Sequence, residues 1–289
     1  MHAFLPVLAL LFAASAWGMV WYPLRLLAEA GIAGPWQAGV SYLSAALVLL
    51  PFSWPRRREL ARHAFALVPL GLTAGWCNVA FIVAMLEGEV VRVLLLFYLS
   101  PVWSVLLAHW LLGEQLDRRT WGALGAALAG AGLMLYEPGV GLPLPTDLAD
   151  WLGLSAGLTF AVSNVETRRL QHVSLHAKTL ATWSGVVTVA AAWVTIAALP
   201  VPAAGAGPWL GTVALGVTVF LCATLAVQYG LTRLPVQRSA VILLVEIVIG
   251  AVSAAWLAGE YTATREWIGG LLILGAGLAV ARGGREVNG

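Results

Sequence analysis

Charged residues are scarce in this chain. Asp, Glu, Lys and Arg make up only 10% of its 289 residues, and lysine occurs once, as Lys178. Soluble domains carry about 25% charged residues. A chain that is 60% hydrophobic could not cover its apolar surface in water with so few charges. The composition therefore excludes a soluble enzyme, a nucleic-acid-binding protein and a disordered chain.

Motifs of several enzyme classes are also missing. Lys178 follows Ala177, so the chain has no GxxxxGK[ST] phosphate-binding loop, and it contains neither HExxH nor GxSxG. No second His or Cys accompanies His109 at metal-ligand spacing, and Cys77 and Cys222 are expected to be free thiols. We predict no catalytic residue, no metal and no cofactor, and a protein that is not an enzyme.

Long apolar runs fill most of the sequence instead. A helix needs about 20 mostly apolar residues to cross the hydrocarbon core of a bilayer. Charged clusters and Gly or Pro breaks divide the chain into ten such runs. We therefore predict an all-α integral membrane protein with ten spans, at 4–26, 35–53, 64–86, 92–112, 120–136, 150–169, 178–199, 208–232, 237–258 and 265–282.

The basic residues predict how these spans are oriented. Loops on the cytoplasmic side of membrane proteins carry an excess of Lys and Arg. With the N-terminus inside, thirteen of the sixteen basic residues, Lys178 among them, fall in cytoplasmic loops or the C-terminal tail. Only Arg25, Arg92 and Arg265 fall outside. This distribution predicts that both termini are cytoplasmic.

The two halves of the sequence resemble each other. A shift of 146 residues superposes a Gly-Glu pair and a following Trp, with Gly113-Glu114 and Trp121 on Gly259-Glu260 and Trp267. Each half holds five spans, an odd number, so the second half is predicted to be inverted in the membrane. Such a 5+5 inverted-topology repeat places a central cavity near the midplane, between the halves. The predicted boundaries are 1–137 for the first repeat, 138–149 for the linker and 150–289 for the second repeat.

A Gly-Glu pair follows an apolar span that contains Pro101, and Trp121 and a Gly-rich span come after it; this pattern is repeated once in the chain. The pattern resembles the EamA-type drug/metabolite transporter superfamily, and within it the amino acid exporter branch. The resemblance covers essentially the whole chain. It implies a ten-helix carrier of the bacterial cytoplasmic (inner) membrane, with a cavity lined mainly by helices 1, 3, 4, 6, 8 and 9. Ile247 occupies the position of Pro101 in the second half, which leaves open whether both helices kink alike.

Glu246 is the most informative single residue. It lies about ten residues into the ninth span, where an ionised carboxylate costs several kcal/mol unless it faces protein or water. One interpretation is a contact for a substrate amine or a proton site. The other is a protonated or hydrogen-bonded glutamate that ties helices together.

A sparse set of polar and aromatic side chains accompanies Glu246 in the spans that the resemblance places around the cavity. Each polar member alone is more often a contact between helices than a ligand. Together they suit a small-molecule site in which polar groups hold the substrate backbone and aromatic rings hold its side chain. The predicted substrate-cavity residues are Trp17, Trp21, Asn78, Phe81, Tyr98, Trp103, Ser163, Gln228 and Glu246.

The sequence therefore favours a secondary transporter, expected to be monomeric, that exports neutral or aromatic amino acids by alternating access. A first alternative is a proton-coupled exporter of cationic drugs or amines that uses Glu246 as counter-ion. A second alternative is a membrane enzyme or assembly partner that transports nothing. No Lys or Arg is predicted in the middle of a span in the second half, which argues against the branches that carry anionic sugar phosphates.

Overall fold

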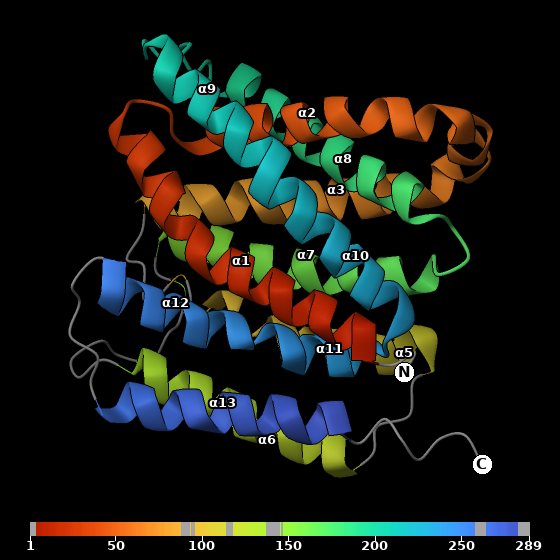
Figure 1. The fold of residues 1–289 in the computed structure, drawn as a ribbon, viewed down its shortest axis with the longest axis vertical. Helices are drawn as coiled ribbons and strands as arrows, with labels where there is room; N and C mark the ends of the chain where they lie inside the picture. The colour runs from red at the N-terminus through yellow and green to blue at the C-terminus, as the bar shows by residue number, and fades with distance from the viewer. Residues whose placement is uncertain are drawn as a thin grey trace.

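The computed structural model describes residues 4–87, 93, 96–113, 118–136, 145, 147–257 and 264–282, and within them every regular element is helical (Figure 1). The helices are α1 (Phe4–Glu29), α2 (Gly34–Ser53), α3 (Arg57–Glu87), α5 (Ser100–Leu112), α6 (Arg118–Leu135), α7 (Leu148–Arg169), α8 (Leu175–Ile196), α9 (Ala206–Leu215), α10 (Leu221–Arg233), α11 (Val236–Leu243), α12 (Val245–Leu257) and α13 (Thr264–Arg282). Two short segments complete them, the 3₁₀ turn η1 (Trp54–Arg56) and the π-helix η2 (Gly216–Phe220).

These helices confirm the ten predicted spans. The eighth span is continuous from α9 through η2 to α10, and the ninth consists of α11 and α12. Among the described residues, five helices are long and apolar enough to cross a membrane by length and composition: α1, α2, α3, α8 and the continuous helix over 206–233. The others are shorter, are interrupted or, like α7, are less apolar.

Two helices start three or more residues earlier than the sequence predicted. The helix α3 begins at Arg57, and α8 begins at Leu175 because the Ser174 side chain caps it by accepting a hydrogen bond from Ala177 N. Lys178 was predicted to lie in a loop. The structure instead places it in the first turn of α8 with none of its surface exposed.

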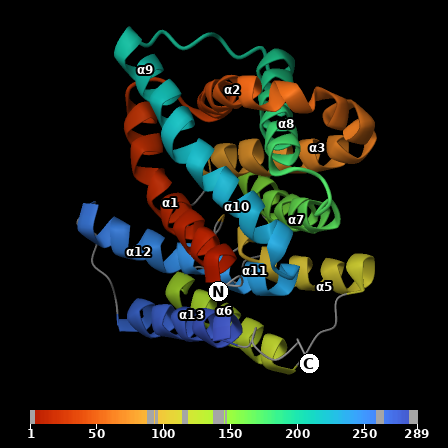
Figure 2. The same ribbon diagram turned by 45° about the vertical axis from the view of Figure 1, so that its right-hand side comes forward.

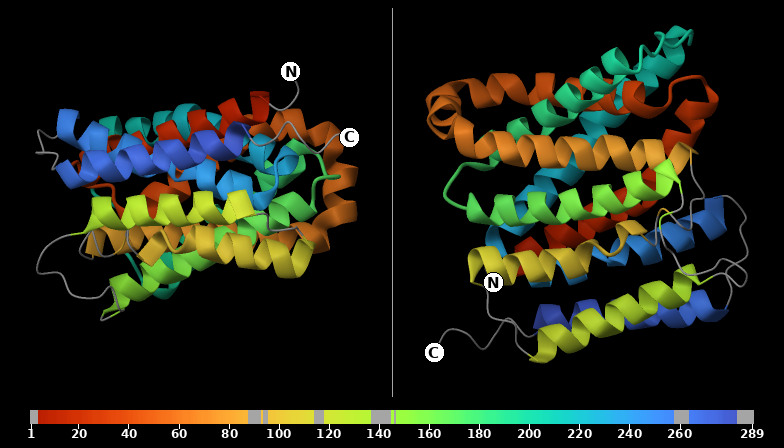
Figure 3. Two further views of the ribbon diagram at one scale, coloured as in Figure 1. Left: turned by 90° about the horizontal axis from the view of Figure 1, so that it is seen from below. Right: turned by 180° about the vertical axis from the view of Figure 1, so that it is seen from behind.

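The first helix of each half packs against helices of the other half, so the two halves do not form separate bodies. The first helix of the first half, α1, packs against α10 and α12 of the second half. The first helix of the second half, α7, packs in the same way against α3 and α5 of the first half. Figure 2 and Figure 3 show α6 and α13, the last helix of each half, lying side by side. Reciprocal packing of this kind is what two inverted repeats around a pseudo-twofold axis produce.

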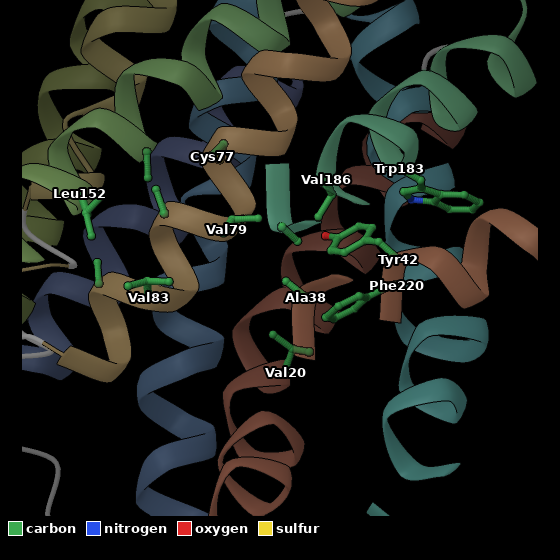
Figure 4. Packing of buried hydrophobic residues seen from close by; sticks show 14 of the residues in the cluster. Val20, Ala38, Tyr42, Cys77, Val79, Val83, Leu152, Trp183, Val186 and Phe220 are labelled. Carbon is green, nitrogen blue, oxygen red and sulfur yellow. The ribbon is translucent and has the colours of Figure 1, made fainter. Parts of the chain in front are cut away.

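The largest apolar core joins α1, α2, α3, α7, α8 and η2 (Figure 4). Tyr42 and Trp183 are almost completely buried in it, and the Tyr42 ring lies 4.8 Å from the ring of Phe220. Glycines bring α3 and α8 into backbone contact, because a Cβ on Gly71 would lie 2.7 Å from Ala181 O. Only glycine permits helices to approach this closely.

The π-helix η2 lies against α2. Ser41 Oγ donates a hydrogen bond to Thr212 O at 3.1 Å, and Ser44 Oγ donates to Val213 O at 3.3 Å. Gly216 N also donates to both of these carbonyls, so the serine hydroxyls add a second hydrogen bond to each. The two serines of α2 therefore hold α2 against the last turn of α9, directly before η2.

Candidate functional site

The fourth and ninth spans are both broken, and they are broken at equivalent positions. In the ninth span, the turn at Leu244 (φ −60°, ψ −16°) separates α11 from α12. In the fourth, a turn at Tyr98 and Leu99 (Leu99 φ −71°, ψ −11°) follows the helical residues 96–97 and precedes α5. Tyr98 and Leu244 are 146 residues apart, which is the repeat shift. The question left open by Ile247 is therefore answered, because the second half breaks without a proline.

A glycine from the opposite half lies against the backbone of each break. A Cβ on Gly18 of α1 would lie 2.7 Å from Glu246 O, and a Cβ on Gly157 of α7 would lie 2.6 Å from Phe97 O. These contacts press each first helix onto the broken helix of the other repeat. Pro101, near the start of α5, suits the first break because an N-terminal turn needs no N–H from that residue.

A small pocket lies between the two breaks. Its volume is about 20 Å³, enough for about one water molecule. Three pairs of its lining positions are related by the repeat shift: 97 with 243, 98 with 244 and 100 with 246. The lining residues are Phe97, Tyr98, Ser100, Ser104, Phe160, Ala240, Leu243, Leu244 and Glu246. The pocket therefore lies between the two repeats, where the sequence predicts a cavity.

Two of the nine predicted site residues, Tyr98 and Glu246, line this pocket directly. Glu246 is half-buried in the first turn of α12. Phe81 lies one layer behind, with its ring centroid 4.6 Å from that of Phe97. The pocket thus combines a carboxylate with a wall of aromatic rings.

The predicted residues of α1 and α3 lie in interhelical contacts instead. Trp17 packs on Phe220, with ring centroids 5.2 Å apart, and Trp21 Nε1 donates to Ser253 Oγ at 3.0 Å. Asn78 Oδ1 accepts a hydrogen bond from the Tyr42 hydroxyl at 2.6 Å, while Asn78 Nδ2 donates to Ala74 O at 2.8 Å. In this conformation Asn78 joins α2 to α3 and does not line the pocket.

The remaining predicted polar residues also have local contacts. Ser163 Oγ donates to Phe160 O at 2.9 Å, and Gln228 Nε2 donates to Thr182 Oγ1 at 3.0 Å. Trp103 Nε1 is buried and has no hydrogen-bond partner in the described part of the chain. The structure therefore brings Tyr98, Phe81 and Glu246 together. It places Trp17, Trp21, Asn78 and Gln228 in contacts between helices, and Ser163 in a bond within α7.

Seven lining residues were absent from the prediction: Phe97, Ser100, Ser104, Phe160, Ala240, Leu243 and Leu244. Ser104 is 1% exposed, and its hydroxyl has no hydrogen-bond partner among the described residues. A serine in an apolar helix carries no signal of its own in the sequence. The repeat shift could have identified Ser100, because it places Ser100 at the position of Glu246.

Lys178 forms a separate polar cluster where α7, α8 and α10 meet. Its ammonium group donates to Thr232 Oγ1 and, at 3.4 Å, to Thr167 O. Arg168 Nη1 donates to Thr232 O at 2.8 Å. The described residues bring no carboxylate to Lys178, so this buried cation is held by neutral oxygens. They also contain no group of three or more His, Cys, Asp or Glu side chains that could hold a metal ion.

Comparisons with known proteins agree with this architecture. The model of the EamA-like transporter family matches the chain twice, over residues 4–136 and 147–282. An uncharacterized transporter of Archaeoglobus fulgidus is 27% identical over 235 residues, which cover 81% of this chain and 82% of that protein. One crystal structure superposes with a TM-score of 0.76 at 18% identity, covering 98% of this chain and 99% of the other. At that identity, the similarity concerns the fold alone.

Proposed function

Because the chain belongs to the EamA-like transporter family, we propose that it is a secondary transporter that exports neutral or aromatic amino acids. The observation that carries the substrate class is Glu246, a half-buried carboxylate in a pocket walled by aromatic rings between two broken helices. Intramembrane acids are rare and costly without a partner. A carboxylate suits a substrate ammonium group, and aromatic rings suit an apolar or aromatic side chain.

The contracted pocket fits one stage of an alternating-access cycle. Its volume of about 20 Å³ is far below the roughly 300 Å³ or more of typical small-molecule pockets. Substrate binding therefore requires the rings of Phe97, Tyr98 and Phe160 to move apart. The breaks before α5 and between α11 and α12 are places where helices can bend with little loss of backbone hydrogen bonding. We assign the gating movements to helices 3–4 and 8–9 of the ten-span count.

The arrangement of loops supports the proposed orientation. The connections between α2 and α3, between α7 and α8, and between α10 and α11 lie at one end of the bundle, at the right in Figure 1. These connections and the adjoining helix ends carry most of the arginines. We assign this end to the cytoplasm of a bacterial inner membrane and treat the carrier as a monomer, with residues 138–149 as the link between repeats.

A second candidate is a proton-coupled exporter of cationic drugs or amines. It is favoured by the absence of Lys and Arg from the described lining of the pocket, so that Glu246 is its single charged residue. An imposed pH gradient separates the two: it should drive a cationic substrate against its own gradient in a proton-coupled exporter, whereas facilitated export of an amino acid should follow the amino acid gradient alone.

The third candidate, a protein without transport activity, is favoured by the side chains that fill the centre of the molecule. A carrier in an occluded stage would have its centre filled by side chains in the same way. A measurement of substrate flux therefore separates a carrier from a protein without transport activity. The test is exchange of radiolabelled amino acids in proteoliposomes under an imposed gradient. If no amino acid moves under any gradient, the proposed function is wrong.

The role of Glu246 is tested in the same assay with Glu246→Gln. A hydrogen bond to a charged group is worth about 1.5–3 kcal/mol, so we expect exchange to fall about tenfold or more. The matched control is Glu166→Gln. Glu166 lies 3.9 Å from Arg169 at the end of α7, and this pair should not affect the pocket. Wild-type exchange and an unchanged pH profile in Glu246→Gln would remove Glu246 from the mechanism.

A further inference from the structure

Two helix N-termini meet at the pocket, and only one of them carries an acid. Helix α12 begins at Val245, with Glu246 in its first turn, and helix α5 begins at Ser100. The N-terminus of a helix carries a partial positive charge. At the start of α5, Pro101 has no N–H, and Val102 N and Trp103 N already donate to Leu99 O. The charged side of the pocket is therefore its α12 side, where Glu246 lies, and the α5 side offers the neutral hydroxyls of Ser100 and Ser104.

The hydroxyl of Ser104 adds a donor to the α5 side. In the described helices of this protein, many Ser and Thr hydroxyls donate to a carbonyl about one turn earlier, as those of Thr159, Ser163 and Thr212 do. Ser104 is buried and lines the pocket, yet its hydroxyl has no such bond and no other partner in the part of the chain described. A buried hydroxyl without a partner is costly, and a ligand oxygen would satisfy it.

The two sides of the pocket carry different side chains at equivalent positions of the repeat. Ser100 and Glu246 occupy equivalent positions, 146 residues apart, at the start of the second segment of each broken helix. The two positions are equivalent in the repeat, but one half supplies a neutral hydroxyl and the other a carboxylate. The two broken helices are therefore related by the repeat, whereas the side chains of Ser100 and Glu246 differ in charge.

We propose that the pocket binds a zwitterion in one orientation, with the ammonium group at Glu246 and the carboxylate at the N-terminal end of α5, where it accepts a hydrogen bond from Ser104. This inference rests on the proposed export of amino acids. It makes Ser104 the residue that selects an amino acid over a simple amine, because an amine without a carboxylate has nothing to accept the Ser104 hydrogen bond.

The test is equilibrium binding of two matched probes to the full chain in lipid nanodiscs. L-Phenylalanine and phenethylamine share the ring and the amine and differ in the carboxylate. We expect wild type to prefer L-phenylalanine, and Ser104→Ala to weaken L-phenylalanine binding about tenfold while leaving phenethylamine unchanged. Glu246→Gln should weaken both probes. Ser239→Ala is the control, because Ser239 is also buried but its hydroxyl already donates to Pro235 O.

A double substitution tests whether positions 100 and 246 are equivalent in the pocket. Glu246→Ser should lose phenethylamine, and Ser100→Glu combined with Glu246→Ser should recover it, because the acid then occupies the equivalent position on the other helix. Size-exclusion profiles and circular dichroism check that each variant is folded.

The outcomes separate this inference from the proposed function. Equal weakening of both probes by Ser104→Ala, or equal wild-type affinity for the two probes, overturns the zwitterion orientation while transport can still stand. Failure of the double substitution to recover phenethylamine in a folded protein overturns the equivalence of the two ends. A wild-type chain that binds neither probe and moves no amino acid overturns the proposed function as well.

Discussion

At Lys178 the chain places its single lysine out of contact with water. The ammonium group donates to Thr232 Oγ1 and Thr167 O, and Arg168 brings a second cation to Thr232. Taking an ammonium ion out of water costs several kcal/mol, which neutral acceptors offset only in part. The packing of α10 against α7 and α8 holds the ammonium group in this position, and the cost would be lower if this end of the bundle opened to water.

We therefore expect Lys178→Met, which retains the length of the side chain, to raise the free energy of unfolding by about 1–4 kcal/mol. Thr232→Val, which keeps Lys178 and removes its acceptor, should lower it by about 1–3 kcal/mol. Thermal unfolding in detergent measures both. Arg169→Met is the control, since the Arg169 side chain is 65% exposed. A marked loss of stability in Lys178→Met would instead identify the lysine as a net stabilising tie.

At the scale of the element, the broken helices depend on close contact with glycine. Gly18 brings α1 onto the backbone of α12 at Glu246, and Gly157 brings α7 onto the backbone at Phe97. The position and angle of Glu246 relative to the pocket are thus set by a neighbouring helix as well as by its own. A methyl group at either glycine would force the pair apart.

Gly18→Ala should lower the free energy of unfolding by about 1–3 kcal/mol, because its Cβ would lie 2.7 Å from a backbone oxygen that cannot move aside easily. Gly122→Ala is the matched control. Its Cβ would meet nothing within 4 Å, so the better helix propensity of alanine should leave stability unchanged or raise it by up to about 1 kcal/mol. Thermal unfolding of both variants decides, and equal effects would argue against the contact.

The elements also show what could be predicted from the sequence. The ten spans follow from the lengths of the apolar runs, and Pro101 indicates a break in the fourth. Nothing local marks the break at Leu244, because it coincides with the contact to Gly18, more than 200 residues away in the chain. Glu246 could be found because an acid is conspicuous in a span. Ser104 could not, since only the missing hydrogen bond distinguishes it from an ordinary helical serine.

At the scale of the whole molecule, the exchange of first helices makes each half incomplete. Without the second half, α1 loses its contacts with α10 and α12. Without the first half, α7 loses its contacts with α3 and α5. The buried faces of these helices would then meet lipid with their polar groups unpaired, which is costly in a bilayer.

We expect residues 1–137 and 150–289, expressed as separate chains, to be unstable alone and to copurify when expressed together. Affinity purification through a tag on one half measures this association, and exchange of labelled amino acids tests whether it restores activity. Two halves that are each monodisperse and resistant to protease, with no affinity for each other, would contradict the reciprocal packing.

The π-helix η2 fixes the rotational phase of the helix that follows it. A π turn contains one residue more than an α turn, and each residue turns an α-helix by about 100°. The face that α10 presents to α8 is therefore offset by about that angle from the face that an unbroken helix starting at Ala206 would present. Gln228 reaches Thr182, and Thr232 reaches Lys178, because of this offset. A regular α turn over the same residues would turn both side chains away, whereas deleting one residue from Gly216–Phe220 would let this turn become α-helical and keep both contacts.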